Sequence, residues 1–261
     1  GFPTSLKLGF DPKEKQPDFL IINGAECEPY ITSDYRCFME EGEDVLEGVL
    51  LMLKYLGIPK CIIGIEKNKP KAIEKMTRLC EKHDNITVKP LKSSYPQGAE
   101  KTLIFSTTGR VVKEGTLPLA SGCIVINSST AAFIAQYIRT GMPLVKRRIT
   151  VDGNIVKKPS NFIVPVGMSI GEIVYYAELS DKPDRIILGG PMMGACAFDP
   201  DYPLSKTNNA VLMFADSPVY EPSECIRCGK CVTVCPYNAL KLDVTLKGKR
   251  RRGTRQEDAD A

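Results

Sequence analysis

The chain has 261 residues, of which 43% are hydrophobic and 25% charged, and its formal net charge is only +4. This length allows two compact domains, and because the excess of basic residues lies largely in 247–255, we expect no nucleic-acid partner. No run approaches the ~18 apolar residues of a membrane helix, and no secretory signal is recognisable, so we expect a cytoplasmic protein with reduced thiols.

The first half of the chain alternates short apolar runs with amphipathic segments. Three apolar runs have the composition of buried strands, namely 18–26, 60–67 and 86–91. Helices are predicted by the apolar spacing and end signals of four segments, 41–57, 69–83, 98–109 and 128–141. Strands that alternate with helices of this length predict an α/β layer with a largely parallel sheet.

The sequence pattern changes near Pro143. Two β-rich runs in 146–167 surround Asp152-Gly153, a strong hairpin signal. A helix over 169–179 and strands over 185–190 and 210–214 follow. This order predicts a small α+β unit, for which a β-grasp-like module is the natural candidate.

Four cysteines near the end of the chain have the spacing C-x2-C-x2-C-x3-C-P: Cys225, Cys228, Cys231 and Cys235. This spacing is typical of ferredoxins and predicts iron–sulfur ligands, whereas zinc sites usually pair two separated C-x2-C hooks. In two-cluster modules the fourth cysteine ligates the other cluster. We therefore expect two [4Fe-4S] clusters in the intact protein and incomplete ligation in this chain. The first residue is not Met, and we expect a fragment of a longer protein.

Several motifs resemble the flavin-carrying subunit of respiratory complex I. GFPTSLKL at Gly1 resembles the end of its G-x-G-G-x-G-F-P-T-x-x-K segment, without the glycine-rich part, and INGAECEPY from Ile22 resembles its N-A-D-E-S-E-P-G-T loop. YPQGAEKTL from Tyr95 and VINSSTA are similar to two further flavin-loop segments. INGAECEPY, GGPMMG at Gly189 and the cysteine run most resemble the C subunit (RnfC) of the Rnf electron-transport complex. Departures from the complex I pattern occur at Ala25, Ala99, Ile126 and Ser128.

The resemblance implies a set of residues that bind FMN or NAD(H). These are Gly1, Lys7, Asn23, Glu26, Glu28, Tyr95, Gly98, Glu100, Asn127 and Thr130. It also implies a complex-I-flavin-subunit-like α/β domain, a β-grasp domain of the soluble-ligand-binding (SLBB-like) class and a ferredoxin-type segment. The corresponding boundaries are 1–143, 144–216 and 217–246, with a disordered tail over 247–261.

The function implied is that of an electron-transfer subunit of a membrane-associated, ion-translocating oxidoreductase. Electrons would pass between NAD(H), FMN and iron–sulfur clusters, because a flavin converts hydride chemistry into one-electron steps. The partners implied are other Rnf-type subunits and, indirectly, ferredoxin, with the subunit peripheral at the inner face of the cell membrane. The alternatives are a soluble RnfC-like reductase of cobalamin or proline metabolism, or a non-catalytic electron-wire or ligand-binding scaffold.

Overall fold

The structure is a computed structural model that describes residues 4–11, 16–215, 229 and 232–233. The chain divides into two units, Gly1–Ser217 and Pro218–Ala261. The helices and strands below all belong to the first unit. The four predicted cluster cysteines and Gly1 lie outside the described residues.

The first part of this unit is built on a four-stranded parallel sheet. Its strands are β1 (Phe19–Gly24), β2 (Lys60–Glu66), β3 (Ile86–Leu91) and β4 (Cys123–Asn127). They lie in the order β3-β2-β1-β4, and each neighbouring pair is parallel. The predicted parallel α/β sheet is therefore confirmed. The strand order reverses beside β1, which puts the carboxyl ends of β1 and β4 next to each other at a topological switch point.

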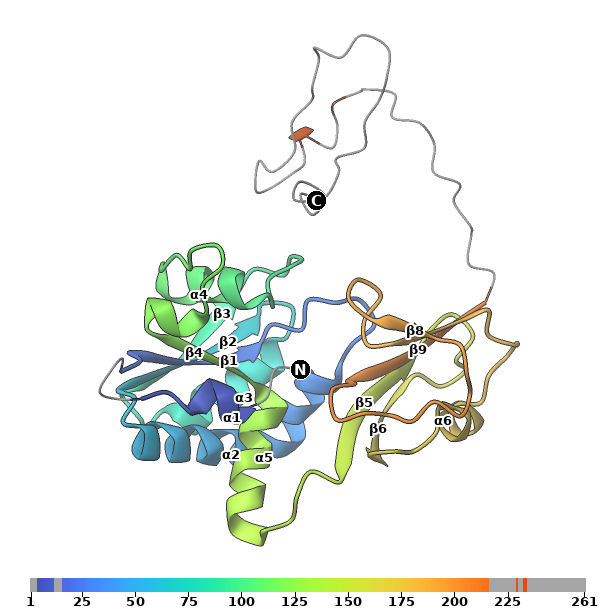
Figure 1. Cartoon of the computed structure of the whole chain (residues 1–261), viewed down its shortest axis with the longest axis horizontal. Helices are drawn as coiled ribbons and strands as arrows, with labels where there is room; N and C mark the ends of the chain where they lie inside the picture. The colour runs from blue at the N-terminus through green and yellow to red at the C-terminus, as the bar shows by residue number, and fades with distance from the viewer. Residues whose placement is uncertain (1–3, 12–15, 216–228, 230–231, 234–261) are drawn as a thin grey trace, which may run out of the picture. The chain divides into compact units, whose positions relative to one another are not determined.

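Helices cover both faces of this sheet (Figure 1). They are α1 (Thr4–Leu8), α2 (Ser33–Leu56), α3 (Pro70–Cys80), α4 (Glu100–Thr108), η1 (Pro118–Ser121) and α5 (Ser128–Thr140). Leu20 and Ile22 of β1 pack in one core with α2, α3 and α5, whereas Ile21 packs in another with α4. Burial on both faces explains why β1 is apolar without alternation.

A second, mixed sheet follows α5. Its strands are β5 (Lys146–Asp152), β6 (Ser160–Pro165), β7 (Arg185–Leu188), β8 (Ala195–Ala197) and β9 (Ala210–Phe214), with α6 (Ile170–Ala177) after β6. The order is β6-β5-β9-β7-β8, and β5 and β9 are parallel. The predicted hairpin, helix and two later strands are present. The β-grasp assignment and the domain boundaries stay predictions, since both sheets belong to one compact unit.

The ends of the elements differ from the sequence-based expectation in a few places. The helix expected from Glu41 begins at Ser33, and Glu41 itself has non-helical angles of φ −123° and ψ 27° that divide α2 in two. The expected stop at Gly57 is confirmed by a left-handed φ of 65°. The sequence analysis missed α1, η1, β4 and β8, all of which have five residues or fewer.

A buried carboxyl group from the loop after β1 caps α2. Thr32 precedes the helix but makes no side-chain cap. Instead, Glu26 accepts hydrogen bonds from the backbone N–H of Asp34 at 2.7 Å and of Tyr35 at 3.3 Å, and its Oε2 lies 3.4 Å from Nζ of Lys69. Burial, with a smaller contribution from the charge of Asp34, raises the pKa of Glu26 to about 8.

The crossing of α2 and α5 depends on one glycine. A Cβ atom on Gly48 would lie 1.9 Å from the carbonyl oxygen of Ala131. We predict that Gly48→Ala lowers the free energy of unfolding by about 2 kcal/mol or more, measured by urea denaturation, because the overlap outweighs the gain in helix propensity. Gly42→Ala on the same helix is the control, since its Cβ would meet only side-chain atoms, of Lys75, Leu79 and Met76 at 3.0, 3.2 and 3.3 Å, and no backbone. Equal effects of the two substitutions would contradict this interpretation.

The raised pKa of Glu26 predicts a specific dependence of stability on pH. The folded protein holds a proton on this carboxyl that the unfolded chain releases, so the stability contributed by Glu26 falls as the pH rises from 4.5 to about 8. The fall is up to about 1.4 kcal/mol per pH unit. Glu26→Gln keeps an oxygen for the Asp34 N–H, and its unfolding free energy should decline less than that of the wild type between pH 5 and 8. Parallel curves from urea denaturation would disprove this.

Candidate functional site

A pocket of about 320 Å³ lies at the carboxyl ends of β1 and β4. Six of the predicted site residues line it, namely Asn23, Glu26, Glu28, Tyr95, Gly98 and Asn127. A second pocket of about 380 Å³ adjoins it, because Glu26, Cys27, Glu28, Ile31 and Tyr95 line both. Pockets of this size at a switch point are the usual location of ligands in open α/β sheets.

Asn23, the penultimate residue of β1, ties two loops of the pocket together. Its Nδ2 donates to the carbonyl of Gly98 at 2.8 Å, and its Oδ1 accepts from the N–H of Ala25 at 3.1 Å. Gly98 N–H in turn donates to Sγ of Cys27 at 3.3 Å. A Cβ on Gly98 would lie 2.4 Å from the carbonyl oxygen of Ala25, so only glycine allows this approach. The amide of Asn23 thus sets the shape of the pocket wall.

Asn127, the last residue of β4, also joins two segments of the chain at the pocket. Its Oδ1 accepts the N–H of Ser129 at 3.0 Å and so caps α5, while its Nδ2 donates to Oδ2 of Asp34 at 3.0 Å. Asp34 Oδ1 also accepts from the hydroxyls of Ser128 and Ser129, both at 3.2 Å. Asp34, which the sequence analysis did not select, therefore joins the first turns of α2 and α5 at the pocket.

The acidic groups of the pocket are individually compensated. Burial raises the pKa of Glu26 to about 8, which disfavours its charged form. Oε2 of Glu28 accepts from two successive backbone N–H groups, of Met192 at 2.9 Å and Met193 at 3.3 Å. Asp34 accepts from one amide and two hydroxyls. The pocket is therefore less negative than its composition indicates.

The adjoining pocket contains a buried oxygen that has no hydrogen-bond partner in the structure. Glu66, the last residue of β2, is 2% exposed, and burial raises the pKa of its carboxyl group. Its Oε2 makes no hydrogen bond, although Glu66 lines the pocket beside Asn68, Lys69 and Ser93. An unsatisfied buried oxygen favours a ligand that brings an N–H or O–H donor.

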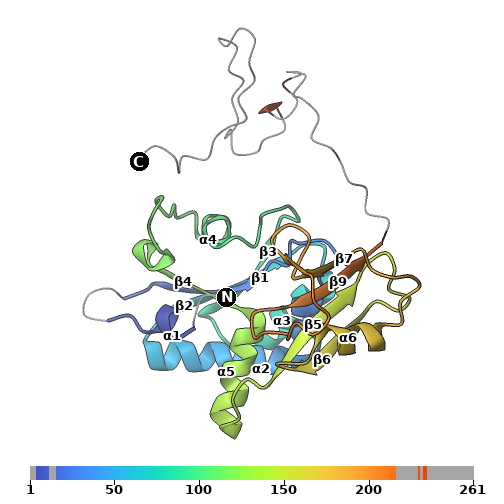
Figure 2. The same cartoon turned by 45° about the vertical axis from the view of Figure 1, so that its right-hand side comes forward.

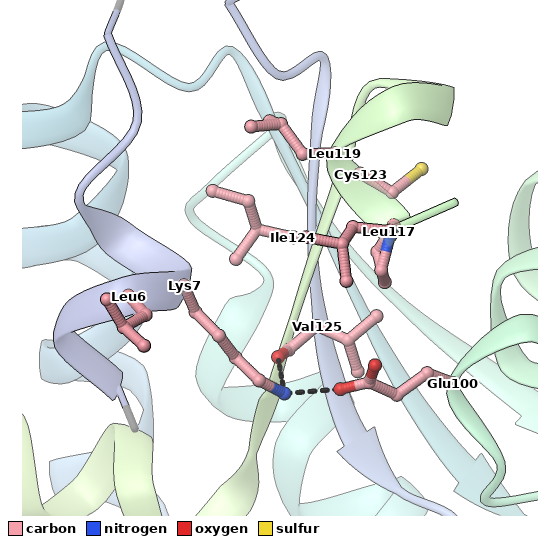
Figure 3. A pocket seen from close by; sticks show the side chains of 9 residues that line it. Leu6, Lys7, Glu100, Leu117, Leu119, Cys123, Ile124 and Val125 are labelled. Atoms are coloured by element: carbon pink, nitrogen blue, oxygen red, sulfur yellow. Dashed lines mark hydrogen bonds and ion pairs between the residues drawn. The ribbon is translucent and has the colours of Figure 1, made fainter. Parts of the chain in front are cut away.

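Lys7 and Glu100 line neither of these two pockets, and their side chains point toward each other (Figure 3). Both line a smaller pocket of about 120 Å³ with Cys123, Ile124 and Val125, and the ammonium group of Lys7 pairs with the Glu100 carboxylate. Lys7 Nζ also donates to the carbonyl of Val125 at 3.1 Å. The salt bridge ties α1 to α4 beside Val125, the middle residue of β4.

The remaining predicted residues are less informative. Thr130 is in the first turn of α5 and is not among the residues that line either larger pocket. Across the described ranges 4–11, 16–215, 229 and 232–233, there is no group of three or more His, Cys, Asp or Glu suited to a metal. The roles predicted for the individual site residues stay predictions.

Besides Asp34 and Glu66, other residues at the two pockets were not predicted from the sequence. Met193 and Asn209, from the second sheet, line the pocket, and Lys69 pairs with Glu26. Ser33 and Asp34 directly before an amphipathic run were a local signal for a helix start. Nothing near Met193 or Asn209 in the sequence indicated contact with residues more than 150 positions away.

Two protein families match this chain. Residues 1–136 match the Nuo51 FMN-binding domain. Residues 218–241, most of which lie outside the described residues, match the 4Fe-4S binding domain. The four predicted cluster cysteines lie within the second match.

Three curated relatives that share 38% identity with the chain are C subunits of oxidoreductase complexes. That of the Na(+)-translocating ferredoxin:NAD(+) oxidoreductase complex of Acetobacterium woodii aligns over 100% of the chain and 59% of its own length. The C subunit of the proton-translocating ferredoxin:NAD(+) oxidoreductase complex of Clostridium ljungdahlii aligns over 95% of the chain and 55% of its own length. The C subunit of the ion-translocating oxidoreductase complex of Rhodobacter capsulatus aligns over 94% of the chain and 48% of its own length. The chain thus spans about half the length of the curated relatives it matches. Its predicted resemblance to RnfC is confirmed.

Solved structures agree on the fold. A chain of an NAD+-reducing [NiFe]-hydrogenase in the H2-reduced state superposes with a TM-score of 0.66 and 20% identity, over 82% of this chain and 43% of that chain. The air-oxidised state of an NAD+-reducing [NiFe]-hydrogenase gives a TM-score of 0.67 at 21% identity. With more than half of its residues matched, the chain belongs to the Nuo51 FMN-binding domain family.

Proposed function

We propose that the protein containing this chain is the electron-transferring RnfC component of an Rnf-type, ion-translocating ferredoxin:NAD(+) oxidoreductase complex. It holds FMN in the pocket at the ends of β1 and β4, and its residues 218–241 supply cysteine ligands to its [4Fe-4S] clusters. The observation that carries this proposal is the meeting of Asn23, Asn127, Tyr95 and Gly98 around one pocket at the switch point of a chain in the FMN-binding family.

The pocket residues fit a flavin. Amide and tyrosyl groups stand beside the apolar side chains of Ala25, Ile31 and Met193, as an amphipathic ring system requires. The positive end of the α5 dipole lies at this pocket, where Asn127 caps the helix and the Asp34 carboxylate accepts from the hydroxyls of Ser128 and Ser129. The raised pKa of Glu26 reduces the negative charge that an anionic cofactor would meet there.

The pocket residues of this chain would bind and orient the flavin, and none of them takes part in a bond change. When bound, FMN accepts a hydride from NADH and returns its electrons singly. Asn23 fixes the loops at Ala25 and Gly98, which would hold the flavin, through its bonds to both residues. The Glu26 carboxyl group fixes the pocket wall by its contacts with the first turn of α2 and with Lys69.

The site of action is proposed from the relatives. Among the described residues, no helix is long and apolar enough to cross a membrane. We place the protein peripherally at the inner, cytoplasmic face of the membrane, bound to the other subunits of the complex, with ferredoxin exchanging electrons indirectly. The names of the relatives, which are subunits of ion-translocating complexes, support this placement.

The proposed function predicts flavin binding and reduction. The full-length protein encoded by the gene that contains this chain, purified without oxygen, should bind one FMN, and NADH should bleach the visible flavin band. Absence of FMN, or a flavin band that NADH leaves unchanged, would refute the proposal.

A variant of Asn23 tests where the flavin lies. Asn23→Ala removes two hydrogen bonds that hold the pocket loops, and the FMN dissociation constant should rise about tenfold or more. Asn85→Ala is the matched control, because Asn85 makes a single 3.5 Å bond to Pro59 at the opposite edge of the sheet. Equal affinity of both variants would place the flavin elsewhere.

A further inference from the structure

The loop of residues 189–194, GGPMMG, is fastened to the loop that follows β1. Oε2 of Glu28 accepts the N–H groups of Met192 and Met193 at 2.9 and 3.3 Å. Successive N–H groups that converge on one anionic oxygen form a nest, an arrangement suited to a carboxylate. The contact joins residues 164 positions apart. It lies between the first and the second sheet, which are side by side in Figure 2.

Glycine is required for this contact. A Cβ on Gly190 would lie 1.9 Å from Oε2 and 2.3 Å from Cδ of Glu28. The turn is closed by a hydrogen bond of 2.7 Å from Gly194 N–H to the carbonyl of Gly190, and a Cβ on Gly194 would lie 2.5 Å from that same oxygen. The glycines of the motif therefore let the backbone receive a carboxylate of the same chain.

The residues after Glu28 reinforce the same junction. Tyr30 packs edge-on against Phe214 at a centroid distance of 5.3 Å. Ile31 is buried with Ile187, Ala210 and Leu212 of the second sheet. The loop of 189–194 is consequently held against a fixed base rather than by the Glu28 carboxylate alone.

Met193 is the member of this loop that reaches the ligand pocket. It lines the pocket together with Asn23, Tyr95 and Asn127, yet 77% of its surface is exposed. A methionine side chain is flexible and polarizable, and its sulfur makes favourable contacts with aromatic rings. An exposed methionine at the rim of a pocket can thus cover a planar ligand.

We propose that Met193 packs against the ring of the bound flavin, and that Glu28 is the positioning residue that holds Met193 there through the 189–194 backbone. This inference rests on the proposed function and deepens it. Glu28 acts on the flavin through the backbone of 189–194, which it holds in place. The part of the chain that forms the second sheet then supplies one wall of the flavin site, and the part that forms the first sheet supplies the others.

Three substitutions in the FMN-loaded full-length protein test the proposal from both sides of the contact. Met193→Ala removes the covering side chain, Glu28→Gln removes the charge that the nest receives, and Gly190→Ala blocks the approach of Glu28. Each should raise the FMN dissociation constant about 3- to 10-fold. Each should also shift the visible bands of the FMN that remains bound, which a loss of folding stability alone would not do.

Double substitution and matched controls complete the test. Glu28→Gln combined with Met193→Ala should weaken FMN binding no more than Met193→Ala alone, since both act through one contact. Gly171→Ala, whose Cβ meets nothing closer than 3.4 Å, and Met142→Ala, an exposed methionine after α5, should leave affinity and spectrum unchanged.

The outcomes separate this inference from the proposed function. A wild-type protein without FMN overturns the proposed function, and the inference with it. A wild-type protein that binds FMN, with an affinity and spectrum that Met193→Ala does not alter, overturns the inference alone. Additive effects of Glu28→Gln and Met193→Ala would show that Glu28 does not act through the loop.

Discussion

The buried carboxyl group of Glu26 at the first turn of α2 is the interaction on which the arrangement of the site depends. A parallel strand must be followed by a loop that turns the chain back into a helix, and the first N–H groups of that helix need acceptors. Thr32 provides no such side-chain bond, so Glu26 does. The helix start and the loop after β1 are thereby fixed to each other.

Fixing the loop at Glu26 has consequences on both of its flanks. Before Glu26 in the sequence, Asn23 donates to the carbonyl of Gly98. The carbonyl oxygen of Ala25 lies so close to Gly98 that no side chain fits at position 98. After Glu26, the segment from Glu28 to Thr32 projects toward the second sheet, where Thr32 N–H donates to Oγ1 of Thr150 at 3.0 Å. This single loop therefore contributes a helix cap, a pocket wall and an interface.

The sequence was sufficient for three of the four strands of the first sheet, β1, β2 and β3, and for part of the site. The strand β1, apolar along its length, and the helical spacing in α2 and α3 are local signals that burial on two faces produces. The loop at Asn23 was identified by resemblance, and six predicted residues do meet at one pocket. Parallel strands bring their carboxyl ends together, so this convergence follows from the fold class itself.

The other features of the fold and of the site depend on contacts between segments that are far apart in the sequence, and no local pattern encodes such contacts. Glu26 and Glu28 are two residues apart and chemically identical, yet one caps a helix and the other enters a nest more than 160 residues away. The short elements α1 and β8 are held by tertiary contacts rather than by propensity, which explains why they were missed. GGPMMG was selected for its resemblance to RnfC, but nothing in the motif indicated that Glu28 would be its partner.

Charge illustrates why residue type alone misjudges such a pocket. Glu26, Glu28 and Asp34 line it, and by composition they would repel an anionic cofactor. Burial disfavours the charged form of the first, paired backbone N–H groups receive the second, and an amide with two hydroxyls satisfies the third. Each device removes negative potential at a different place, and each also joins two segments of the chain. The same carboxyl groups can therefore assemble the pocket without excluding a phosphate from it, because the protein's own donors compensate them before a ligand arrives.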